Sequence, residues 1–219
     1  VGVGYHSQAA SRTDEKKTDS ASGKQYTPKL YPGRNMETRA GATLINVYDR
    51  KGKVLSEDIA PGMCDLYGVG LDAADRLYLL TAASRVLDGK RHPNQWTGTL
   101  AKLDPAQARV LTAGEKGMPL PLNTADLPKR KADVQQGGKT QWLEGAQWMY
   151  GGVGFCGKNS GTGCACHNTR FVLDYFARSF APEMDHYSVA VLDAAGNLIL
   201  RIGRYGNADS AGAKSLEPL

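Results

Sequence analysis

The sequence predicts an all-β fold made of small antiparallel sheets, because two different strand–turn–strand patterns each occur more than once. In the first pattern an aspartate marks a tight turn between two apolar runs, at 46–55, 100–111 and 189–200. In the second pattern a Leu-Asp pair leads through a short turn into an aromatic strand, at 71–78 and 173–180. Repeated short sheets are typical of a β-propeller, whose blades are four-stranded sheets around an axis.

The strands are expected in a definite order along the chain. A hairpin at 44–56 turns at 49–52, where aspartate and glycine supply the turn geometry. Strands at 66–71, 76–80, 99–103 and 109–112 are expected to form one sheet, and strands at 170–174, 178–181, 188–192 and 198–202 a second. This is too few for a closed ring, so we expect an incomplete propeller, completed by another protein chain or by further blades.

Two segments do not follow the strand patterns. Residues 1–42 are polar and broken by prolines and glycine, which predicts a polar arm or linker before the blades at 43–219. Residues 114–141 contain several prolines and a glycine pair and show little periodicity. This composition predicts an irregular connector between two sheets.

Composition and charge narrow the class of protein. Hydrophobic residues make up 41% of the 219 residues, which is typical of a folded globular chain. No run approaches the ~20 apolar residues of a membrane helix, so we expect no membrane span. The net charge is +5, but the lysines and arginines are scattered along the chain. Nucleic-acid binding proteins gather such charges on one face, so we expect no nucleic-acid binding.

The C-terminal strands resemble a known repeat. The runs 171–182 and 187–197, together with the closing segment Arg-Ile-Gly-Arg-Tyr-Gly at 201–206, are similar to the NHL repeat. The resemblance is best at 170–207, is weaker at 66–114 and covers about half of the chain. It implies an NHL-type propeller that acts as a binding or scaffolding surface, although some relatives are lyases or hydrolases with a central metal. Asp75 and Ala177 stand where that repeat usually has a turn glycine, and no catalytic residue is carried over.

The cysteines form the densest group of reactive side chains. Three of the four lie within a dozen residues and are followed at once by a histidine; the set is Cys64, Cys156, Cys164, Cys166 and His167. Disulfides are the favoured interpretation, because a crosslink offsets the entropic cost of ordering the glycine-rich loop; the pairing stays open. Disulfides also indicate an extracytoplasmic protein, periplasmic or secreted.

Two cofactors are alternatives to the disulfides. Cys164, Cys166 and His167 could bind a divalent metal, although their spacing differs from that of zinc knuckles. They could also attach haem c, with His167 as axial ligand, although the spacing departs from C-x-x-C-H. Our principal expectation is that no cofactor is bound.

The other candidates have simpler interpretations. Aspartates at the turns could be taken for calcium ligands or catalytic acids, but their shared placement indicates side chains that bond backbone amides in Asx-turns; they are Asp49, Asp72, Asp104, Asp174 and Asp193. Trp142 and Trp148 are expected to pack within the blades, and a sugar-stacking platform is the alternative. His6, His92 and His186 are expected at the surface.

These observations favour a non-catalytic binding or assembly module. Such a module predicts an exposed apolar patch along an unpaired sheet edge, because an open edge needs a partner. One alternative is a redox protein that carries haem or a metal at 156–167. The other is a propeller lyase or hydrolase with a central divalent metal, which would require carboxylates or histidines that converge on one rim.

Overall fold

The computed structural model describes residues 2–8, 17–18, 25–26, 42–56, 59–60, 62, 66–113, 121–122, 127–136, 138–155 and 169–204. These residues form strands and turns, which confirms the all-β class. Within them, no helix is long and apolar enough to cross a membrane.

Most strands belong to two large sheets. The 8-stranded sheet has the order β19-β18-β17-β15-β10-β7-β6, with β16 paired to β17. Its strands are β6 (Leu66–Leu71), β7 (Leu77–Thr81), β10 (Gly98–Leu103), β15 (Ala146–Val153), β16 (Val172–Leu173), β17 (Ser179–Glu183), β18 (Ser188–Leu192) and β19 (Leu198–Ile202). The 6-stranded sheet has the order β12-β11-β14-β13-β8-β9. Its strands are β8 (Ser84–Leu87), β9 (Lys90–His92), β11 (Arg109–Ala113), β12 (Pro121–Leu122), β13 (Val134–Gln136) and β14 (Lys139–Glu144).

Two smaller sheets come from the N-terminal part of the chain. A 3-stranded sheet has the order β1-β4-β5 and consists of β1 (Gly2–Gln8), β4 (Ala42–Tyr48) and β5 (Val54–Ser56). A 2-stranded sheet joins β2 (Lys17–Thr18) to β3 (Gln25–Tyr26). The segment that we expected to be a polar arm therefore begins as a strand, because Gly2–Gln8 pairs along its whole length with Ala42–Tyr48.

The aspartate turns are confirmed. In each turn the Oδ1 atom accepts a hydrogen bond from the backbone N–H two residues later, and in most of them also from the N–H four residues later. These bonds fix a short turn that reverses the chain, which is why each aspartate stands between two strands. The last four predicted strands pair in the expected order, from β16 to β19. They do not form the separate second sheet that we expected, because β15 joins β17 to β10 and places them in the same sheet as β6 and β7.

The prediction of one sheet from 66 to 112 is wrong at its last strand. β6, β7 and β10 pair as expected, but β11 lies in the other large sheet, where it pairs with β14. The cause is a bend where the chain passes between the two large sheets twice, from β10 to β11 and from β14 to β15. The two passages are joined there, since the N–H of Asp104 donates to the carbonyl of Gly145 at 2.9 Å. Gly145 has a φ of +75°, and a Cβ there would lie 2.9 Å from the nitrogen of Ala108. A glycine is therefore needed at the corner.

A second corner lies between β7 and β8. Ala82 and Ala83 are fully buried there, and the N–H of Ala83 donates to the Oγ1 atom of Thr81 at 3.2 Å. Strands that change sheet through such bends are typical of packed β-sheets rather than of separate propeller blades. The expected irregular connector at 114–141 likewise contains β13 and the start of β14.

The sheets stack in layers. One core cluster lies between the 6-stranded sheet and one face of β7 and β10, and it includes Leu79, Ala101, Val110, Val134 and Leu143. A second cluster lies between the other face of these strands and the last hairpins, and it includes Leu80, Leu100, Ala181, Ala190 and Leu192. β7 and β10 are therefore buried on both faces.

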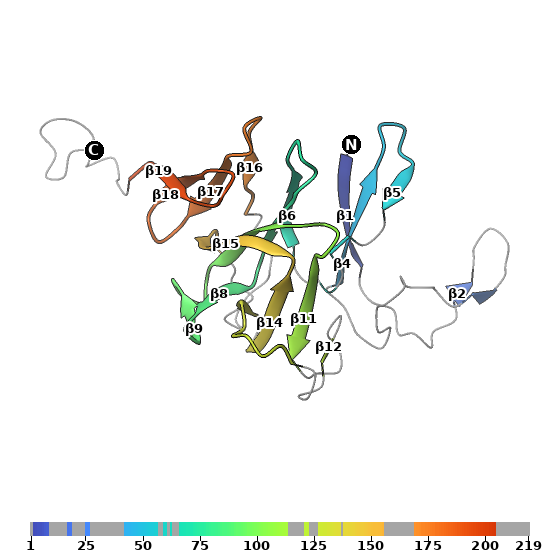
Figure 1. The fold of residues 1–219 in the computed structure, drawn as a ribbon, viewed down its shortest axis with the longest axis horizontal. Helices are drawn as coiled ribbons and strands as arrows, with labels where there is room; N and C mark the ends of the chain where they lie inside the picture. The colour runs from blue at the N-terminus through green and yellow to red at the C-terminus, as the bar shows by residue number, and fades with distance from the viewer. Residues whose placement is uncertain are drawn as a thin grey trace, which may run out of the picture.

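The last hairpins lie at one end of the molecule. In Figure 1 the orange and red strands β16–β19 are at one end of the longest axis, and the blue strands β1, β4 and β5 lie toward the other. None of the sheets in the described part of the chain closes on itself, so a complete propeller ring is not present there.

Candidate functional site

The strands β16–β19 form a four-stranded antiparallel meander, and its two faces have different chemistry. Residues directly opposite each other in adjacent antiparallel strands point to the same side of the sheet. Ala181, Ala190 and Arg201 are opposite one another and share the inner face, which packs on the second core cluster. Phe180, Val191 and Leu200 are opposite one another and share the outer face.

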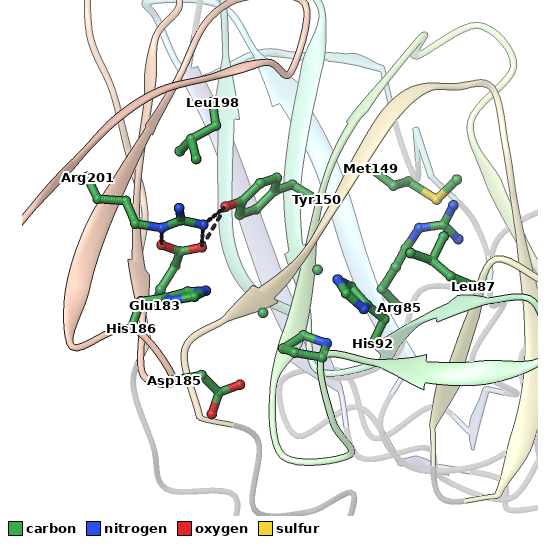
Figure 2. A pocket seen from close by; sticks show the side chains of 13 residues that line it. Arg85, Leu87, His92, Met149, Tyr150, Glu183, Asp185, His186, Leu198 and Arg201 are labelled. Carbon is green, nitrogen blue, oxygen red and sulfur yellow. Dashed lines mark hydrogen bonds and ion pairs between the residues drawn. The ribbon is translucent and has the colours of Figure 1, made fainter.

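The inner face carries a buried carboxylate. Glu183 is 4% exposed, and its Oε1 atom accepts a hydrogen bond from the Tyr150 hydroxyl at 2.5 Å. The Arg201 guanidinium donates to both carboxylate oxygens, at 2.6 Å and 3.2 Å. Ser188 also donates to Oε2 at 3.3 Å. Figure 2 shows that Tyr150 and Arg201 approach the carboxylate from different strands, so the cluster ties β15 to β17 and β19.

The electrostatics keep this cluster in one protonation state. Burial raises the pKa of Glu183, but hydrogen bonds from Arg201 and Tyr150 outweigh it and hold the pKa below its usual range. Burial, followed by the hydrogen bond and the charge of Glu183, raises the pKa of Tyr150 to about 12. A general acid or base works best with a pKa near the operating pH. Neither group meets that condition, so the cluster is suited to holding strands and charge in place.

A pocket adjoins the cluster. It has a volume of about 420 Å³ and lies between β8 and β9 on one side and β17–β19 on the other. Figure 2 shows the Glu183 cluster with His186 and Asp185 on one wall, and Arg85, His92, Leu87 and Met149 on the opposite wall. Gly151 and Gly152 complete the lining, together with Pro93 and Leu198.

The glycines let the strands meet closely behind this pocket. A Cβ on Gly151 would lie 2.6 Å from the Cβ atom of Arg85 and 2.8 Å from the carbonyl oxygen of His92. Any larger residue would push β15 away from β8 and β9. The close approach therefore sets the width of the pocket.

The outer face is apolar throughout. Its residues are Val172, Phe180, Pro182, Val189, Val191, Leu200 and Ile202, as the strand register places them. Val172, Leu200 and Ile202 are 62%, 48% and 53% exposed. We call this set the outer apolar face. β19 is also the last strand of its sheet in the described part of the chain, where it pairs with β18 alone.

The two tryptophans of the alternative stacking platform pack against other residues of the fold. Trp142 is 5% exposed, and its indole N–H donates to the carbonyl of Arg130 at 3.0 Å, so its ring faces are unavailable to a sugar. Trp148 packs edge-on against Tyr78 at 5.7 Å between ring centroids. Its indole N–H donates to the carbonyl of Ala194 at 3.1 Å, and a Cβ on Gly196 would lie 2.6 Å from its ring. Both tryptophans are packing residues, the interpretation that we favoured.

The residues of the pocket were not predicted as a site. His92 and His186 are exposed, as expected from the sequence. Tyr150, Glu183 and Arg201 lie on separate strands, and no local spacing relates them. The apolar run of β19 does indicate the outer apolar face, because a strand with one face in solvent usually alternates apolar and polar residues.

The predicted cysteine sites lie outside the described residues. This applies to Cys64, Cys156, Cys164, Cys166 and His167, so the disulfide, metal and haem hypotheses stay predictions. Among the residues that the structure does describe, no group of three or more histidine, cysteine, aspartate or glutamate side chains could hold a metal ion.

No protein-family model matches the chain, and no curated protein matches it. A solved structure of a protein of unknown function from Bacteroides caccae aligns with 90% of the chain, at 12% sequence identity and a TM-score of 0.27. The chain spans 58% of the length of that protein's chain. A likeness this weak carries no argument about fold or function.

Proposed function

We propose that this chain is a non-catalytic binding and assembly module, whose outer apolar face packs against a further β-sheet of a protein. The observation that carries the proposal is the exposure of apolar side chains on this face of the last meander: Val172, Leu200 and Ile202. Large contiguous apolar patches are rare on monomeric proteins and mark interaction sites.

The layered packing supports the same proposal. β7 and β10 are apolar on both faces because the 6-stranded sheet covers one face, and β17 and β18 of their own sheet cover the other. The meander repeats this pattern, with a covered inner face and an apolar outer face, so a further sheet in the stack would bury the remaining side chains. Burial of apolar surface contributes roughly 25 cal/mol per Å².

The partner that fits is a further propeller-type sheet. The meander has four antiparallel strands joined by short turns, which is the strand order of a propeller blade. An adjoining blade, from this protein or from another chain, would cover the outer apolar face and shield the open edge of β19. Export to an extracytoplasmic compartment is part of this proposal and rests on the cysteines alone.

The first test is self-association and dye binding. We expect the chain to bind the dye ANS and to associate with rising concentration in analytical ultracentrifugation, because Val172, Leu200 and Ile202 of the outer apolar face are exposed among the described residues. The double variant Leu200→Lys/Ile202→Glu should lose both properties, since both changes put charge on this face. Ultracentrifugation and ANS fluorescence are measured on the same samples.

The matched control changes an exposed apolar residue elsewhere. Tyr175 is 89% exposed and lies in the turn between β16 and β17, outside the outer apolar face. Tyr175→Ser should leave association and dye binding unchanged. A wild-type chain that stays monomeric at all concentrations and binds no ANS would contradict the proposal.

A further inference from the structure

The pocket beside Glu183 has the size and the mixed lining of a small-molecule site. Its volume of about 420 Å³ is within the range of roughly 300–1,000 Å³ that is typical of ligand pockets. Such pockets are mostly apolar and hold a few polar groups that orient the ligand. The chemistry of those polar groups decides which ligand fits.

Three of the four carboxylate oxygens in the pocket accept hydrogen bonds from protein donors. Both oxygens of Glu183 accept hydrogen bonds, from Tyr150, Arg201 and Ser188. The Oδ2 atom of Asp185 accepts a hydrogen bond from the side-chain amide of Asn94 at 2.6 Å. A cationic ligand would therefore compete with existing donors for these oxygens.

The donors of the pocket are less committed. The imidazoles of His92 and His186 line it from opposite walls and make no hydrogen bond within the described part of the chain. The Arg201 guanidinium uses its Nε and Nη2 atoms on Glu183, and within the described residues its Nη1 atom donates to no acceptor. A guanidinium and two imidazoles are groups that bind a carboxylate through charge-assisted hydrogen bonds.

The rest of the lining is apolar. Leu87, Pro93, Met149 and Leu198 line the pocket beside these donors. An aliphatic chain placed against them would be removed from water, and each buried CH₂ should raise the affinity by about fourfold. The walls therefore combine anion-binding donors with an apolar surface.

We propose that this pocket binds a small organic acid, with its carboxylate between His92 and His186 and its apolar body against Met149 and Leu198. The ligand class follows from the committed carboxylates and the uncommitted donors. The site is distinct from the outer apolar face, since Arg201 and Leu198 lie on the opposite side of β19 from Leu200.

Hexanoate is the probe for the experiment, and hexylamine and hexanol have the same chain length with a different head group. NMR of the methionine methyl groups and the histidine rings follows each titration. We expect hexanoate to shift the Met149 methyl signal and the His92 and His186 ring signals in a saturable way. Hexanol should bind more weakly, and hexylamine should cause no saturable shift.

The double variant His92→Ala/His186→Ala should weaken hexanoate binding by roughly thirtyfold, because it removes two charge-assisted bonds of about 1 kcal/mol each and about 1.4 kcal/mol corresponds to tenfold. Both histidines are exposed, so we expect the variant to fold, which its melting temperature checks. Tyr175→Ala, outside the pocket, should bind as the wild type does. Equal binding of hexylamine, unchanged affinity of the double variant, or no saturable shift at Met149 would each overturn the proposal.

Discussion

Ala177 and Asp75 adopt a backbone conformation that usually belongs to glycine. Their φ angles are +59° and +58°, at the ends of the turns that Asp174 and Asp72 begin. The left-handed region costs a residue with a Cβ roughly 1–2 kcal/mol, and glycine adopts it freely. A glycine at either position would adopt this conformation without that cost.

Ala177→Gly should therefore stabilise the protein. We expect the free energy of unfolding to rise by about 0.5–1 kcal/mol, because relief of strain exceeds the added entropy of the unfolded chain. Urea denaturation measures the change. Ala181→Gly is the matched control in the middle of β17, where the same substitution should be destabilising. A loss of stability in Ala177→Gly would show that the turn is not strained.

Glu183 predicts how stability depends on pH. Its folded pKa lies below the ordinary value of about 4.3, since Arg201 and Tyr150 stabilise the ionised form against burial. A group with a depressed folded pKa contributes stability above its unfolded pKa, and this contribution is lost as the pH falls through the folded pKa. Glu183→Gln should therefore be less stable than the wild type at pH 7, by about 2 kcal/mol.

The difference between wild type and Glu183→Gln should shrink below about pH 4.3, as the wild-type carboxylate becomes protonated. Urea midpoints at pH 7, 5, 4 and 3 measure it. A difference that stays constant over this range would show that Glu183 contributes only packing. Ser188→Ala is a control, since it removes one bond to the carboxylate and keeps the charge.

At the scale of elements, the hairpins could be predicted and the sheets could not. Asp49, Asp72, Asp174 and Asp193 fix their turns through bonds to amides a few residues away, so a short window of sequence contains the whole cause. The corner at Gly145 depends instead on Asp104, far away in the chain. Strands on either side of a corner have the same apolar alternation, so the sequence does not show where one sheet ends.

The pocket shows the same limit. Tyr150 and Glu183 are 33 positions apart, and they meet because Val153 pairs with Glu183 where β15 joins β17. A single pair of opposite residues joins these two strands, and no turn sequence specifies that pair. The outer apolar face was easier to anticipate, because an unpaired edge with exposed apolar residues follows from the strand pattern of β19 itself.

At the scale of the whole molecule, two segments that each follow a cysteine in the sequence contact each other. Arg170 donates to the carbonyl of Tyr67 at 2.5 Å, and a Cβ on Gly68 would lie 3.1 Å from the ring of Phe171. Cys64 precedes Tyr67 by three positions, and Cys166 precedes Arg170 by four. A crosslink between Cys64 and the cysteine cluster would close a long loop, and long loops give the largest entropic stabilisation.

We therefore expect two disulfides, one of which joins Cys64 to the cluster at 156–166. Intact mass under denaturing conditions should rise by about 4 Da on reduction, and an absorption spectrum of the same sample should show no Soret band. Peptide mapping without reduction identifies the partner of Cys64. A retained haem mass with a Soret band would instead place Cys166 and His167 at a redox centre. An unchanged mass would leave all four thiols reduced and remove the argument for export, because disulfides persist in oxidising compartments.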